Sequence, residues 1–136
     1  MPKLVRFTDR EKRFLDTIEG CSITTVYPDN RPHIVPVNFL LIDGLFYIAS
    51  DYNTRKVKNI QLNDKVALLF ATFNPNRAMI IEGEASLLEH GPEFKHIYDL
   101  FYKRFSWVRN DPWSEGEAPF IIVKPVKKIR WGLKST

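Results

Sequence analysis

Tight-turn sequences recur in this chain between short runs of β-branched and aromatic residues, a pattern typical of antiparallel strands joined by hairpins. Asp43-Gly44 lies between two apolar runs and is a strong signal for a two-residue hairpin. The sequences Pro-Asp-Asn-Arg at 28–31 and Asn-Pro-Asn-Arg at 74–77 predict two further turns. Six strands are expected, over residues 21–27, 32–42, 45–50, 65–73, 78–89 and 118–131.

Short helices are expected around these strands. Thr8 and Glu11 form the sequence pattern of a capping box, so a helix begins there, and Gly20 is expected to end it in a left-handed conformation. Two more helices are predicted, from about Thr54 and over 92–106, and a solvated loop over 107–117. Six strands joined mostly by hairpins and flanked by short helices favour a closed antiparallel barrel in a single domain spanning residues 1–136.

Composition and missing motifs exclude several classes of protein. No apolar run approaches the roughly 20 residues that span a bilayer, and no secretory signal is evident. A single cysteine, Cys21, permits no internal disulfide and points to the cytoplasm. Three scattered histidines predict no metal site, and hydrolase, P-loop and Rossmann motifs are absent. The net charge of +4 is compatible with an anionic partner.

The strongest chemical signal lies where the strand 45–50 gives way to the next helix. Ser50 ends this strand, and Thr54, Arg55 and Lys56 open the helix four residues later. A helix start offers free N–H donors and a partial positive charge, so these residues together suit a phosphate dianion. Spacing alone favours a plainer alternative, in which threonine caps the helix and two basic residues are solvated.

Two other segments carry weaker signals. Pro36 cannot donate a hydrogen bond within a sheet, so the segment His33 to Asn38 must have an edge or a break at which a ligand could bind the free backbone. An edge strand without a ligand is equally compatible with this sequence. The basic segment 124–134 could bind a nucleic-acid backbone with Trp131 as a stacking platform, although a charged edge strand is the more common outcome.

The order of these elements resembles the pyridoxamine 5'-phosphate oxidase-like family of flavin-binding split β-barrels. The similarity runs from about Thr8 to Glu89 and rests most on YPDNRPHIVPVNF and on LFYIASDYNTRKVKNIQLNDKVALLF, which contains Ser-x-x-x-Thr-Arg-Lys after an aromatic strand. It continues more weakly through Ile-Arg-Trp near the C-terminus. The resemblance implies a mainly β (α+β) fold, a six-stranded antiparallel split β-barrel with short flanking helices.

The resemblance also implies FMN bound between the two subunits of a homodimer. The phosphate would be held by the residues around Ser50 and Thr54 to Lys56. The isoalloxazine ring would lie beside the segment His33 to Asn38, largely against its backbone. A tryptophan of the partner subunit would cover the ring. The cofactor-binding residues implied are Ala49, Ser50, Thr54, Arg55 and Lys56; His33, Ile34, Val35, Pro36, Val37 and Asn38; and Trp107 and Trp131.

Departures from the family pattern narrow the implied activity. His33 and Asn38 stand where the vitamin B6 oxidases carry arginine and lysine, and Ala78 stands where many relatives carry glutamine. The resemblance therefore implies an FMN-dependent oxidoreductase acting on a different small molecule, with no catalytic side chain assigned. The alternatives are a deazaflavin-dependent reductase of the same fold, and a barrel that binds flavin or nucleic acid without catalysis.

Overall fold

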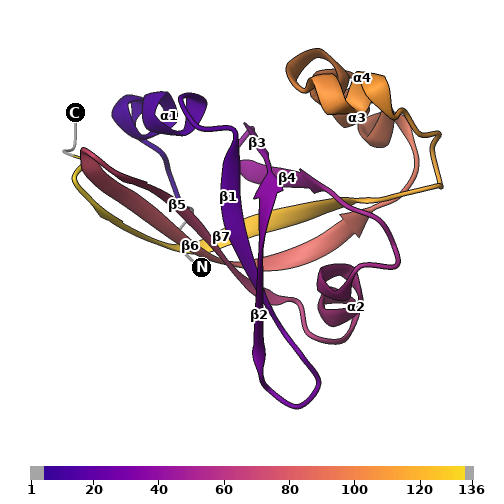
Figure 1. Ribbon diagram of the computed structural model, residues 1–136, viewed down its shortest axis with the longest axis horizontal. Helices are drawn as coiled ribbons and strands as arrows, with labels where there is room; N and C mark the ends of the chain where they lie inside the picture. Colours follow the sequence, from indigo (N-terminus) through magenta and orange to yellow (C-terminus); the bar gives the residue numbers. More distant parts are fainter. Residues whose placement is uncertain (1–4, 134–136) are drawn as a thin grey trace.

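One curled antiparallel sheet with helices at both ends makes up the protein in the computed structural model, which describes residues 5–133 (Figure 1). Within these residues the sheet has seven strands in the order β2-β1-β5-β6-β7-β4-β3. The strands are β1 (Gly20–Val26), β2 (Pro32–Asn38), β3 (Leu40–Ile42), β4 (Leu45–Ala49), β5 (Lys65–Phe73), β6 (Asn76–Leu88) and β7 (Phe120–Trp131). The helices are α1 (Asp9–Asp16), α2 (Arg55–Leu62), α3 (Pro92–Arg104) and α4 (Ser106–Asn110). The expected mainly β split barrel with short flanking helices is confirmed.

The prediction of six strands is wrong because the segment 32–42 is two strands. Its first part pairs with β1 and its second part with β4, so the chain passes from one end of the sheet to the other at Phe39. Phe39 is buried, with its ring centroid 4.8 Å from that of Phe70 and 6.1 Å from that of Phe46. A phenylalanine anchored in the core thus separates β2 and β3, which are not hydrogen-bonded neighbours.

The capping box of α1 is confirmed, but the predicted role of Gly20 is wrong. Thr8 Oγ1 accepts from the backbone N–H of Glu11, and the Glu11 carboxylate accepts from the N–H of Thr8. The helix ends at Thr17 in a right-handed conformation, and Gly20 begins β1 instead. A Cβ atom on Gly20 would lie 3.1 Å from the carbonyl oxygen of Val37, so glycine serves the close approach of β2.

Part of the predicted loop 107–117 is helical. Helix α4 occupies residues 106–110, and Val108 within it is fully buried. It packs with Phe101 and Phe105 of α3 and with Phe120 of β7 in a second hydrophobic cluster, separate from the core inside the sheet. The aromatic residues around 107–113 therefore belong to a packed unit at the end of the barrel far from α1 (Figure 1).

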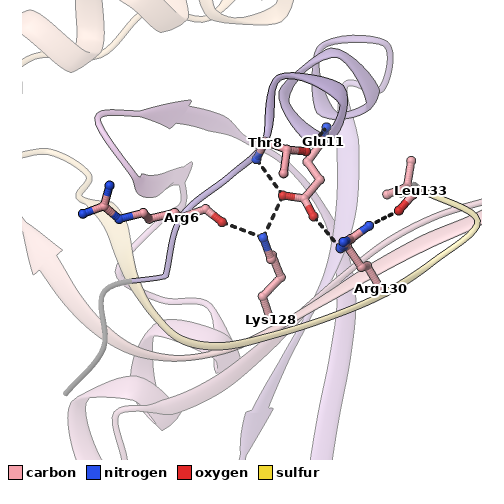
Figure 2. Close-up of polar contacts among 6 residues, drawn as sticks. All are labelled: Arg6, Thr8, Glu11, Lys128, Arg130 and Leu133. Carbon is pink, nitrogen blue, oxygen red and sulfur yellow. Dashed lines mark hydrogen bonds and ion pairs between the residues drawn. The ribbon is translucent and has the colours of Figure 1, made fainter. Parts of the chain in front are cut away.

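A buried carboxylate fixes α1 to the C-terminal half of the chain. Glu11 is fully buried, and its two oxygens lie 2.7 Å from Lys128 Nζ and 2.8 Å from Arg130 Nε (Figure 2). Lys128 also donates to the backbone carbonyl of Arg6. Burial tends to raise the pKa of Glu11, but hydrogen bonds from Lys128 and Thr8 and the nearby positive charges outweigh it and lower the pKa below its ordinary value of 4.5.

None of the helices among residues 5–133 is both long and apolar enough to cross a membrane.

The Cys21 thiol is unpaired and buried in β1, and burial raises its pKa to about 12. The thiol is therefore protonated and unreactive at neutral pH.

We predict that Glu11→Gln lowers the free energy of unfolding by about 3–5 kcal/mol, because it removes the fully buried carboxylate that pairs with the partly buried Lys128 and Arg130. Glu19→Gln, which breaks an exposed ion pair with Arg104, should cost no more than about 1 kcal/mol. Urea denaturation measures both. Since the folded-state pKa of Glu11 is lowered, its carboxylate stabilises the fold above pH 4.5 and loses this effect as the pH falls. A Glu11→Gln deficit that does not shrink on acidification contradicts this assignment.

Candidate functional site

A pocket of about 420 Å³ opens where β4 ends and α2 begins. Ala49, Ser50, Asp51, Thr54 and Lys56 line one part of it. The rest of the lining comes from the segment 107–118, which follows α3 and leads into β7. The structure therefore places most of the predicted phosphate-binding residues around one cavity.

The start of α2 keeps its backbone donors available. Thr54 stands at the N-cap position, but its hydroxyl donates to the carbonyl of Asp51 over 2.8 Å and caps no helix N–H. Ser50 Oγ lies 3.0 Å from Thr54 Oγ1, so the two hydroxyls are hydrogen-bonded to each other. The alternative of an ordinary threonine cap is therefore wrong, and in the described part of the chain the Thr54 side chain leaves the first-turn N–H groups of α2 uncapped.

Arg55 and Lys56, the two basic residues that open α2, point in different directions. Lys56 lines the pocket and forms no ion pair or hydrogen bond with residues in the described range 5–133. Burial lowers the pKa of Lys56 from its ordinary value of 10.5, and the negative charge of Asp51 partly opposes this effect. Arg55 points elsewhere: its guanidinium carbon lies 5.1 Å from the ring centroid of Tyr27, on which Arg31 also stacks at 5.0 Å. Lys56 is thus the cation that an anion in this pocket would meet.

Two tryptophans form the aromatic part of the pocket. The rings of Trp107 and Trp113 are nearly parallel, at 11°, with centroids 6.0 Å apart. Trp107 Nε1 donates to Asn38 Oδ1 over 2.9 Å, which ties the pocket to the end of β2. Two predicted site residues from distant parts of the sequence are therefore in direct contact. Trp113 Nε1 is buried without a hydrogen-bond partner in the described part of the chain.

Strand β2 is an edge strand, as Pro36 required. Residues 32–38 all pair with β1 on one side, and within residues 5–133 no strand is hydrogen-bonded to the other side. Val35 and Val37 pack toward the core, whereas Ile34 and Pro36 face outward. The ring of His33 lies edge-on to Tyr27 at 5.6 Å, and its buried Nδ1 atom has no hydrogen-bond partner among residues 5–133. The outer edge of β2 thus presents free backbone near Asn38.

Trp131 lies away from this pocket. It ends the 12-residue strand β7, whereas the pocket borders the beginning of that strand, and its Nε1 atom donates to Asn76 Oδ1. Trp131 is 44% exposed and is not among the residues that line the pocket. In the basic segment 124–134, Lys128 and Arg130 are engaged by Glu11, and Lys134 lies outside the described residues.

Three functional features were missed from the sequence. Trp113 was placed in a solvated loop, although two tryptophans six residues apart are unusual for such a loop. Tyr27 supports Arg55, and only its place just before a turn hinted at exposure. The carboxylates of Asp51, Asp111 and Glu117 also line the pocket, so its charge is mixed and the anion would have to lie close to Lys56.

The strand order and the break at Phe39 define the protein as a split β-barrel. A sequence model described as pyridoxamine 5'-phosphate oxidase matches residues 7–127, which is most of the chain. The chain therefore belongs to the pyridoxamine 5'-phosphate oxidase family. No curated protein matches its sequence.

Solved structures with the same fold are named for different ligands, namely haem, FMN and FAD. The haem storage protein HutZ from Vibrio cholerae has a TM-score of 0.82 at 14% identity, and the match covers 95% of this chain and 97% of that one. A pyridoxamine 5'-phosphate oxidase-related, FMN-binding protein from Nostoc punctiforme has 0.69 at 13%, covering 87% and 78%. A FAD-binding protein from Mesorhizobium loti has 0.69 at 14%, covering 86% and 88%. These likenesses show the fold.

We predict that the pKa of the Lys56 ammonium group lies below 10.5 and rises when inorganic phosphate is added, because a bound dianion stabilises the charged form. NMR titration of lysine side chains measures this, with Lys56→Gln identifying the signal. An unchanged Lys56 pKa at saturating phosphate rules out anion binding beside this residue.

Proposed function

We propose that this protein is an FMN-dependent oxidoreductase acting as a homodimer in the cytoplasm on a small molecule still to be identified. The observation that carries the proposal is the half-buried, unpaired ammonium group of Lys56 beside the uncapped start of α2. These groups, with the hydroxyls of Ser50 and Thr54, suit the FMN phosphate. Arg55, next to them in sequence, would contribute through the electrostatic field of the helix start rather than by direct contact.

The remainder of the site suits a flat, polar ring system. The free edge of β2 offers backbone donors and acceptors around Val35, Pro36 and Val37, and Trp107 joins this edge to the pocket through Asn38. Bound flavin would supply the hydride-transfer chemistry. The residues of this chain would hold and orient it, and backbone donors near the ring would favour its reduced, anionic form.

The chemistry of the lining favours flavin over haem. Haem iron takes an axial ligand from histidine, cysteine, methionine or tyrosine. None of these residue types lines the pocket among residues 5–133. The FMN-binding and FAD-binding relatives of this fold support a flavin in the same family. A deazaflavin coenzyme, whose acidic tail would also be attracted to Lys56, is the alternative that the binding experiment below must separate.

An apolar outer surface of the sheet supports the homodimer. Leu69, Ile80 and Ile129 lie in direct register across β5, β6 and β7, and they point away from the core. Leu69 is 37% exposed and Ile129 36% exposed. We call these three residues the outer row. Acidic and basic side chains border it in pairs, such as Glu82 opposite Lys127, so a twofold copy of the same surface would meet complementary charges.

We predict that the purified protein binds FMN and that Lys56→Gln weakens its affinity at least about tenfold, because a charge-assisted contact is worth roughly 1.5–3 kcal/mol. Arg55→Gln should cost less, since Arg55 stacks on Tyr27. Fluorescence titration with FMN measures both, and Lys58→Gln on an exposed position of the same helix is the matched control.

Three results would count against this assignment. Equal losses in Lys56→Gln and Lys58→Gln would mean that only overall charge matters. Tight binding of a deazaflavin coenzyme with no binding of FMN would replace the cofactor. A Soret band in place of the flavin bands in the absorbance spectrum of the purified protein would favour haem.

We predict that Leu69→Lys converts the dimer into a monomer, because two copies of the new charge would meet at the outer row near the twofold axis. Leu62→Lys, at an exposed leucine of α2 outside the sheet, should leave the dimer intact. Light scattering coupled to size-exclusion chromatography measures the mass. A dimeric Leu69→Lys variant, or a monomeric wild-type protein, would place the subunit contact elsewhere or remove it.

A further inference from the structure

A second pocket, of about 200 Å³, lies at the end of the barrel that carries α1. Arg10 and Arg13 of α1 and Arg77 of β6 bring three guanidinium groups to its lining. Phe14, Thr17 and Leu133 complete it. It borders the residues just after β7, whereas the pocket at Lys56 borders those just before β7 (Figure 1). The two pockets are separate sites within one subunit.

The side chains of these three arginines carry charge that no described residue neutralises. Within residues 5–133, none of the three guanidinium groups has a hydrogen bond or ion pair. Of the acidic side chains on α1, Glu11 is bound to Lys128 and Arg130, and Asp16 lines a different pocket with Lys12. Asp9, four residues before Arg13, forms no ion pair within residues 5–133. Three like charges in one pocket repel one another, so this arrangement costs stability unless an anion occupies it.

The pocket is held in shape independently of any ligand. The buried ion pairs of Glu11 fix α1, and Arg130 also donates to the backbone carbonyl of Leu133, which lines the pocket (Figure 2). Gly132 has a positive φ of 71°, and a Cβ there would clash with the carbonyl of Asn76, next to Arg77. The guanidinium groups are therefore presented by two elements whose relative position is set.

We propose that this pocket binds the phosphate group of a small phosphorylated molecule. Guanidinium groups match phosphate oxygens through paired N–H donors, and three of them suit a dianion better than a singly charged carboxylate. Phe14 and Leu133, which are 3% and 5% exposed, form a small apolar floor beneath the three arginines. The confined volume favours a small ligand over a polymer backbone. The proposal does not depend on flavin binding at Lys56.

The test is calorimetric titration of the full-length protein with inorganic phosphate and with glycerol phosphate at constant ionic strength. Arg13→Gln and Arg77→Gln should each raise the dissociation constant of glycerol phosphate about tenfold or more. Lys12→Gln, which removes a positive charge from α1 outside the pocket, should leave it unchanged. Lys56→Gln should remove only the separate binding event beside α2 and leave the one at the arginines. Glycerol phosphate should bind more tightly than inorganic phosphate if the apolar floor is used, and equal affinities would assign the site to free phosphate.

Thermal melting in chloride separates a binding role from a structural one. Relief of repulsion predicts that Arg13→Gln melts no lower than the wild-type protein in chloride but loses the upward shift caused by phosphate. Loss of binding in Lys56→Gln alone would place the phosphate at α2 and overturn the proposal. Equal weakening in all four variants would reduce it to charge screening, and binding of an oligonucleotide without binding of glycerol phosphate would overturn the small-ligand assignment.

Discussion

The fold depends on one residue at which the chain changes strands. Phe39 carries the backbone from β2 to β3, the two ends of the sheet, and its buried ring holds that crossing against Phe46 and Phe70. Because β2 and β3 are not hydrogen-bonded neighbours, no strand of the described residues is hydrogen-bonded to the outer edge of β2. That free edge ends at Asn38, which binds Trp107 of the candidate pocket. The same break that makes the barrel split therefore leaves backbone groups next to the site.

The charges of this small protein are used in two opposite ways. Glu11 is buried and paired with Lys128 and Arg130, so its charge stabilises the position of α1. Lys56 is partly buried with no such partner, and its lowered pKa reflects a cost that folding leaves in place. Burial of an uncompensated charge is costly unless a partner arrives. An unpaired cation beside a helix start is for this reason better evidence for a ligand than a basic sequence pattern alone.

Local sequence signals predicted the strands and turns because each depends on neighbouring residues: the Asp43-Gly44 turn and the capping box of Thr8 and Glu11 are both present. The break at Phe39 was not predictable in this way, since an unbroken apolar run gives no sign that its two halves have different partners. Adjacent Arg55 and Lys56 looked equivalent in sequence, but helix geometry turns them about 100° apart, and only Lys56 reaches the pocket. Trp113 was missed because its partners come from α3 and α4.

The fold alone does not choose the cofactor, since proteins named for haem, FMN and FAD share it at about 14% identity. The choice has to come from side chains. A haem site needs a ligand atom for iron, and the lining of this pocket offers hydroxyls, an ammonium group, carboxylates and indole rings instead. These groups can hold a phosphate and a flat ring, which together describe a flavin mononucleotide. The start of α2, which the Thr54 side chain leaves uncapped, carries this argument further than the overall likeness does, because its N–H donors and partial positive charge favour an anion.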